Sequence, residues 1–306
     1  MNQVADALAT FGTRLSHVSV ILLALAVALH TAGLLLRATA WRAVLAAAVP
    51  GGRPAWRSVT GAYLAGTAVN GVVPARGGDV ARIVLARRAL PGACCITVAA
   101  GLLVETMLDA VVGGTLLAWA IWSGALPGGL IAIHGGTPGI AGVCLVAAAA
   151  AVLAARRRGA AMRVARDLRR GLTILKSPGL YLTRVAAPQL AAWSVRVAAM
   201  VCFMHAFHIA AGPRQAVLAI LAGSVTTVVP LTPGGVGTQQ ALLVVLLAGV
   251  ASPSAAISFG LGMQLVVTAV NVALGGTCMG LMLGTMPWRA RIAVPPEAVE
   301  VTTSGD

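Results

Sequence analysis

The sequence predicts an all-α, polytopic integral membrane protein, a helical bundle with about eight apolar segments. Of the 306 residues, 58% are hydrophobic and only 10% are charged, and the mean hydropathy is +0.91. Soluble domains have a much larger charged fraction. Several segments run about 18 residues or more with little charge, which lets a helix cross roughly 30 Å of hydrocarbon. The net charge of +14 comes from basic residues at segment ends, so it indicates membrane topology and not a nucleic-acid partner.

The apolar segments lie, in chain order, at roughly 18–38, 58–75, 94–122, 138–155, 181–211, 215–231, 239–250 and 255–285. The first is too long for the apolar region of a signal peptide, and Arg37 lies at its end, so we expect an uncleaved helix. We expect residues 1–288 to form one transmembrane domain, followed by a polar tail at 289–306. The two halves of the transmembrane domain, about 17–155 and 181–288, are joined by the basic loop 156–180.

The loop 156–180 contains the densest group of basic residues, beginning at Arg156. Positive charge marks the cytoplasmic side, so we expect a multi-pass protein of the cell membrane whose loop 156–180 and C-terminus are cytoplasmic. Four apolar side chains in this loop share one helical face: Val164, Leu168, Leu172 and Leu175. This pattern predicts a short helix lying in the membrane interface.

Two regions break the apolar pattern with Pro and paired Gly. The sequence is NGVVPARGGDVAR at 70–82 and TTVVPLTPGGVGTQQ at 226–240. Pro removes a backbone donor and Gly weakens a helix, and a broken backbone persists in a bilayer only where protein or a wet cavity surrounds it. The breaks therefore predict a cavity, with one discontinuous helix in each half of a possible inverted repeat. Alternatively, Pro and Gly simply end two ordinary helices in loops.

The segment 58–75 has basic residues on both sides. Two precede it, Arg53 and Arg57, and four follow it, Arg76, Arg82, Arg87 and Arg88. Both ends therefore have a cytoplasmic character. This favours a re-entrant hairpin over 58–90, matched by a second hairpin over 215–250 from the outer face. The alternative is eight plain crossings with one positively charged outer loop.

Charged residues follow the first break at helical spacing. Arg76, Asp79 and Arg82 are three residues apart, and Glu105 and Asp109 lie one turn apart in the next apolar segment. Each carboxylate at the bilayer centre costs about 2.5–3.5 kcal/mol, so the pair requires a cation, a proton or water. We expect Arg76 and Arg82 to hold a phosphate-bearing headgroup while the carboxylates balance charge. The alternative is an ion-pair network that only joins helices.

Further polar candidates lie in the second half. Arg196, three residues after Trp193, either adds a cation to the cavity or extends to the interface. At the second break, Thr238 is placed to cap a helix whose backbone amides favour an anion. The sequence has no nucleophile motif, phosphate-binding loop or metal-ligand spacing, so we expect no enzyme, no cofactor and no metal.

Taken together, these motifs resemble the lysylphosphatidylglycerol synthase transmembrane-domain family, also called flippase-like or UPF0104 proteins, over roughly 20–285. The motifs are Arg37 with Trp41-Arg42, Asn70-x3-Pro74-x-Arg76-x-Gly78-Asp79-x2-Arg82, Glu105 with Asp109, Trp193, and Pro230-x-Thr232-Pro233-Gly234-Gly235-x-Gly237. The resemblance implies a lipid-handling domain, which in bifunctional members is thought to move aminoacylated phospholipid between leaflets. Those members add a cytosolic aminoacyl-transferase domain. This sequence reaches Asp306 without one, so we expect no synthase activity.

The sequence departs from the family pattern at two positions. The family commonly has Glu-Arg where this chain has Glu105-Thr106, and Glu where this chain has Gln240. One acid and one base are lost, so the charge balance is kept while the site changes. We therefore expect a different lipid.

The leading hypothesis is translocation of a phospholipid or lipid-linked intermediate through a polar intramembrane cavity. The expected partners are membrane lipids that are anionic or bear phosphate, and no nucleic acid. The candidate residues are Asn70, Pro74, Arg76, Asp79, Arg82, Glu105, Asp109, Arg196, Pro230, Thr232, Pro233, Gly234, Gly235, Gly237 and Gln240. One alternative is an accessory subunit, without transport, for a separate transferase of lipid aminoacylation or glycosylation. Another is an intramembrane transferase that uses the carboxylates as acids.

Overall fold

The computed structural model describes residues 18–49, 54–73, 77–90, 92–125, 166–228 and 237–284. All regular elements in these ranges are helical. Four helices are long and apolar enough to cross a membrane: α2 (Val20–Ala48), α5 (Cys95–Trp122), the continuous helix Pro178–Ala206, and α13 (Pro253–Gly284). The predicted all-α membrane class is confirmed. The segment 138–155 lies outside the described residues, so the count of eight segments stays a prediction.

Helix α2 continues well beyond the predicted segment 18–38. Residues 39–48 are mostly Ala and other good helix formers, and the helix ends only at Val49, which is extended (φ −113°, ψ 95°) before Pro50. Arg37 therefore lies inside a long helix and not at its end. Helix α2 runs antiparallel to α10 (Ala187–Ala206), and the Ser19 N–H donates to the Ala206 carbonyl at 3.0 Å.

Helices α3 (Trp56–Val72) and α4 (Gly77–Ala89) form a tight antiparallel hairpin. α3 ends at Val73, which is extended (φ −94°, ψ 123°) because Pro74 follows. The Gly78 N–H donates to Asn70 Oδ1 at 2.8 Å. A Cβ atom at Gly78 would collide with the Gly66 carbonyl oxygen, so the two backbones can approach this closely only because Gly78 lacks a side chain.

A second pair of short helices occurs in the other half of the chain. α11 (Pro213–Val228) begins with Pro in its first turn, and α12 (Thr238–Leu246) begins after Gly237, whose φ is +91°. The Gly237 N–H donates to Gln240 Oε1 at 2.6 Å, which satisfies one free donor at the helix start. The two helices contact each other, and Gly223 of α11 lies against Gln239. The connection at 229–236 lies outside the described residues.

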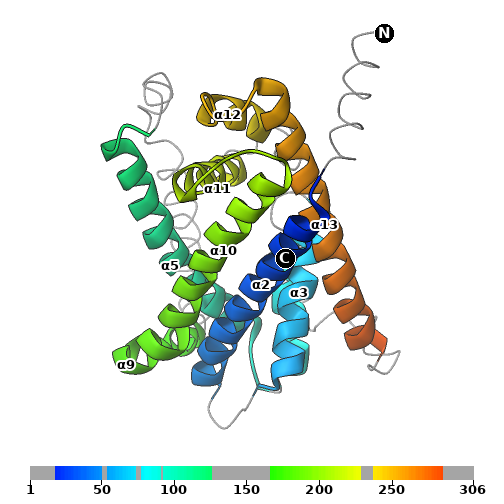
Figure 1. Cartoon of the computed structure of the whole chain (residues 1–306). Helices are drawn as coiled ribbons and strands as arrows, with labels where there is room; N and C mark the ends of the chain where they lie inside the picture. Colours follow the sequence, from blue (N-terminus) through cyan, green and yellow to red (C-terminus); the bar gives the residue numbers. More distant parts are fainter. Residues whose placement is uncertain are drawn as a thin grey trace, which may run out of the picture.

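The long helix α13 contacts both pairs of short helices. In Figure 1, α11 and α12 gather at the upper end of the bundle and α3 lies in the lower half. The contacts follow the same order along α13: Gly260 with Leu243, Gln264 with Gln240, Thr268 with Gly71, Gly275 with Leu64, and Met282 with Gly61. The beginning of α12 and the tip of the α3–α4 hairpin therefore meet α13 about one helical turn apart, near its middle.

The helix that leads into α10 contains a π-helical segment. α9 (Pro178–Tyr181) and α10 are joined by the π-helical segment η2 (Leu182–Ala186). Pro188 explains this local widening, because its ring displaces the carbonyl one turn earlier and it has no N–H to donate. The widening changes the helical register ahead of Gln189, Trp193 and Arg196, which all lie on α10.

The apolar side chains predicted to form one interfacial face in the loop 156–180 point in different directions in the structure. Residues 166–171 are helical and a 3₁₀ turn, η1 (Thr173–Lys176), follows. This change of geometry rotates the side chains, so Leu168 and Leu175 are exposed while Leu172 packs against the bundle. Ile174, which was not part of the predicted face, is fully buried between α2 and α5. Val164 lies outside the described residues.

Candidate functional site

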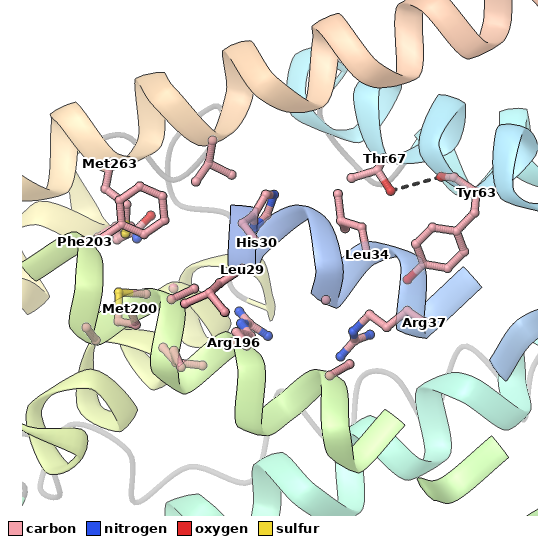
Figure 2. A pocket seen from close by; sticks show the side chains of 18 residues that line it. Leu29, His30, Leu34, Arg37, Tyr63, Thr67, Arg196, Met200, Phe203 and Met263 are labelled. Atoms are coloured by element: carbon pink, nitrogen blue, oxygen red, sulfur yellow. Dashed lines mark hydrogen bonds between the residues drawn. The ribbon is translucent and has the colours of Figure 1, made fainter. Parts of the chain in front are cut away.

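A cavity of about 330 Å³ lies between the long helices and both pairs of short helices. One part of its wall is apolar, with Leu29, Met200, Phe203, Met263 and Val267 among the lining residues. Its polar lining residues are His30 and Arg37 from α2, Tyr63 and Thr67 from α3, Arg196 from α10, and Gln239 from α12. Figure 2 shows the two arginines extending from different helices toward this space. The cavity thus combines an apolar wall with a cationic one.

Asp109 holds three helices together beside the cavity. Its Oδ2 accepts a hydrogen bond from Arg37 NH1 at 2.7 Å, and its Oδ1 accepts one from Arg37 NH2 at 2.8 Å. The indole N–H of Trp193 donates to the same Oδ1 at 2.9 Å. Asp109 therefore joins α5 to both α2 and α10, and three donors satisfy its charge.

Glu105 occupies a similar position one turn earlier on α5. Its Oε2 accepts from Arg82 NH2 at 2.6 Å, and its Oε1 accepts from the Tyr63 hydroxyl at 2.9 Å and from Arg37 NH1 at 3.5 Å. The side chain of Gln189 donates to the Glu105 backbone carbonyl at 3.4 Å. Glu105 is buried, and these donors offset the cost of keeping its charge in the membrane.

Arg82 is enclosed by aromatic rings. Its guanidinium carbon lies 4.1 Å from the centre of the Trp41 ring and 3.7 Å from that of Tyr63. The side chain is buried and faces Glu105, and it is not among the residues that line the cavity. Cation–π contacts in a desolvated site are worth about 2 kcal/mol, so Arg82 is bound firmly within the protein.

Arg196 is the cation in this region of the described structure that has no carboxylate partner. Its guanidinium lies 5.1 Å from the centre of the Trp193 ring, and the residue lines the cavity. Trp193 contacts two charged residues through different parts of its side chain: its N–H donates to Asp109, and its ring faces Arg196. The Arg196 charge therefore remains available to a ligand.

Two polar contacts connect the cavity region to α13. His30 Nε2 lies 2.9 Å from Asn271 Oδ1, and Gln240 donates to Gln264 Oε1 at 3.2 Å. His30 lines the cavity, whereas Gln240 is buried beside it on α12, next to the cavity-lining Gln239. These contacts fix α2 and α12 against the middle of α13.

The structure brings some of the candidate residues together and separates others. Arg82, Glu105 and Asp109 belong to one network, and Arg196 lines the adjoining cavity. Asn70 and Asp79 meet at the hairpin turn, where Asn70 Nδ2 donates to Asp79 Oδ1 at 3.2 Å. Gly237 and Gln240 begin α12. The remaining candidates lie outside the described residues: Pro74, Arg76, Pro230, Thr232, Pro233, Gly234 and Gly235.

Several residues at the cavity were absent from the predicted site: His30, Arg37, Tyr63, Thr67 and Gln239. Arg37 was treated as marking the end of an apolar segment, although the good helix formers after it are a signal that the helix continues. Tyr63 and His30 are polar-ended side chains inside apolar segments, which is a usable signal for a membrane cavity. Thr67 and Gln239 carry no such signal in the sequence.

Comparison with known proteins places this architecture in a family. No curated protein and no solved structure shows a detectable match to the chain. The family described as the lysylphosphatidylglycerol synthase TM region matches residues 6–275, which include every helix described here except the last turns of α13. The chain therefore belongs to the lysylphosphatidylglycerol synthase transmembrane-region family.

Proposed function

We propose that this protein moves a phospholipid or a lipid-linked intermediate between the leaflets of the membrane. The observation that carries this proposal is the cavity between the two pairs of short helices, which has both a cationic and an apolar wall. A headgroup can occupy the polar part while its hydrocarbon chains stay in the bilayer. The family supports a function linked to membrane lipids, because the matched description is that of the transmembrane region of a lipid synthase.

The placement of the basic residues supports one orientation of the bundle in the membrane. Arg42, Arg57, Arg88, Lys176 and Arg184 lie near the end of the bundle where α2 and α4 end and α3 and α10 begin. We infer that this end faces the cytoplasm. The α3–α4 hairpin then extends from the cytoplasmic side and the α11–α12 pair from the outer side. Each half of the chain then consists of a helix, a hairpin and a second helix, which is the order expected of an inverted repeat.

The two carboxylates support a transport function more strongly than an enzymatic one. Glu105 and Asp109 each accept hydrogen bonds from side chains on at least two other helices. A general acid or base needs a free proton-exchanging oxygen near its substrate. In this arrangement the carboxylates instead hold Arg37 at the cavity wall and Arg82 in the adjoining network.

Reconstitution tests the proposal directly. Tail-labelled lipids of several headgroup classes are placed in liposomes that contain the purified protein. An impermeant quencher, or a protein that extracts lipid, reaches only the label in the outer leaflet. Transport should therefore accelerate the loss of the label in the inner leaflet. Protein-free liposomes prepared in the same way are the control. If folded protein exchanges no lipid from a broad panel, the transport function is refuted. A stable complex with a transferase, together with no exchange, would instead establish the accessory-subunit function.

A further inference from the structure

The charges around the cavity identify the class of headgroup that fits it, an inference that rests on the proposed function. Within the described network, Arg37 is paired with Asp109 and Arg82 with Glu105. Arg196 has no carboxylate partner among the described residues, so three arginines face two carboxylates. Among these five side chains one positive charge remains, and it lies on the cavity wall.

We infer that the cavity selects a lipid whose headgroup carries one net negative charge, a phosphodiester without a compensating amine. The phosphate oxygens would accept hydrogen bonds from Arg196, whose guanidinium can bind them through two N–H groups. Such a headgroup neutralises the single unpaired charge. A charge inside a membrane protein is costly until it is paired, so this pairing favours occupancy of the cavity.

The same geometry disfavours a headgroup that also carries an ammonium. The carboxylates that could receive an ammonium are occupied: Asp109 by Arg37 and Trp193, and Glu105 by Arg82 and Tyr63. An ammonium in the cavity would face Arg37 and Arg196, and none of the described residues that line the cavity is acidic. Lysylphosphatidylglycerol, which has two ammonium groups and a net positive charge, is therefore a poor fit, and a zwitterionic choline lipid is intermediate.

Trp193 strengthens the assignment of Arg196 to the ligand. Its N–H donates to Asp109 Oδ1 at 2.9 Å, and the Arg196 guanidinium lies 5.1 Å from the centre of its ring. The ring holds Arg196 at the cavity wall without neutralising it, since a cation–π contact leaves the N–H groups free. Arg196 is thus oriented and still able to bind a phosphate.

The experiment measures leaflet exchange in proteoliposomes for three tail-labelled lipids: phosphatidylglycerol, phosphatidylcholine and lysylphosphatidylglycerol. The wild-type protein should exchange phosphatidylglycerol fastest and the lysyl lipid slowest. Arg196→Gln should slow phosphatidylglycerol exchange about tenfold or more, toward the phosphatidylcholine rate, because a charge-assisted hydrogen bond is lost. Arg184→Gln removes the same charge away from the cavity and should leave all three rates unchanged.

A binding measurement separates this inference from the proposed function. In detergent, added phosphatidylglycerol should raise the melting temperature of the wild type and of Arg184→Gln but not that of Arg196→Gln. If no lipid is exchanged yet this selective stabilisation appears, transport is refuted and the headgroup assignment stands. Equal exchange or binding of all three lipids by the wild type, or a preference for the lysyl lipid, overturns the assignment even if Arg196→Gln does not fold.

Discussion

Arg37 and Asp109 form a bidentate ion pair inside the helical bundle, with N–O distances of 2.7 and 2.8 Å. The pair joins the middle of α2 to α5, in segments whose other side chains are mostly apolar. Removing one partner leaves an uncompensated charge in a low-dielectric region, which typically costs about 3–5 kcal/mol. This relationship underlies the first prediction.

Arg37→Gln and Asp109→Asn should each lower the stability of the protein strongly, by about 3 kcal/mol or more. The double variant should be less destabilised than the sum of the two, because the second substitution removes the charge that the first left unpaired. Unfolding of the purified protein, followed by circular dichroism, measures the three differences. Additive effects would show that the two side chains do not depend on each other.

Gly78→Ala should disrupt the α3–α4 hairpin, because a Cβ atom at this position would collide with the Gly66 carbonyl oxygen. Forcing an extra methyl group into such a contact typically costs about 1–3 kcal/mol. Gly113→Ala in α5 is the matched control, since nothing lies within 4 Å of a Cβ atom there. Comparable melting temperatures for Gly78→Ala and the wild type would contradict the close packing of this hairpin.

A cross-link should form between the tip of the first hairpin and the middle of α13. A Cβ atom on Gly71 would lie 3.6 Å from Thr268 Cγ2, which brings the two side chains within reach of a disulfide. Gly71→Cys with Thr268→Cys, in a chain whose five native cysteines are replaced by Ala, should therefore oxidise readily. Gly71→Cys with Ser252→Cys, just before the start of α13, should not. A reversed order of cross-linking efficiency would show that the hairpin tip lies elsewhere.

Trp193→Phe and Trp193→Leu should separate the two functions of this side chain. Phe keeps an aromatic ring near Arg196 but cannot donate to Asp109, so we expect a stability loss of about 1 kcal/mol and nearly normal lipid exchange. Leu removes both contacts and should also slow exchange. Equal exchange rates for the two variants, at equal protein incorporation, would contradict an orienting contact between the ring and Arg196.

The sequence predicts the helical membrane class and the carboxylate pair well, because charges inside apolar segments are informative on their own. Glu105 and Asp109 needed cations, and the structure supplies Arg82 and Arg37. Arg37 was not identified as a partner, because the apolar segment was taken to end near it and because the packing of α2 against α5 and α10 is a tertiary feature. The enclosure of Arg82 by Trp41 and Tyr63 depends on three separate helices, which no local pattern reveals.

Some features of the cavity can be predicted from the local sequence pattern, and others depend on the three-dimensional structure. Pro and Gly at the two breaks predicted a cavity at the breaks, and helices next to both breaks line one cavity. The residues at 74–76 and 229–236 lie outside the described part of the chain, so their place at the cavity stays a prediction. Which side chains face it depends on helix rotation, and at α10 this rotation follows from the π-helical segment Leu182–Ala186. Thr67 and Gln239 therefore become visible as lining residues only in three dimensions.

The central claim is that lipid headgroups pass through this cavity, and filling it is the most direct test. Thr67→Trp places a large side chain in the cavity, whereas Thr115→Trp places the same side chain on an exposed face of α5. Leaflet exchange of labelled phosphatidylglycerol should fall to the protein-free rate for Thr67→Trp and stay at the wild-type rate for Thr115→Trp, with both variants folded. Wild-type exchange by folded Thr67→Trp would contradict a path through the cavity.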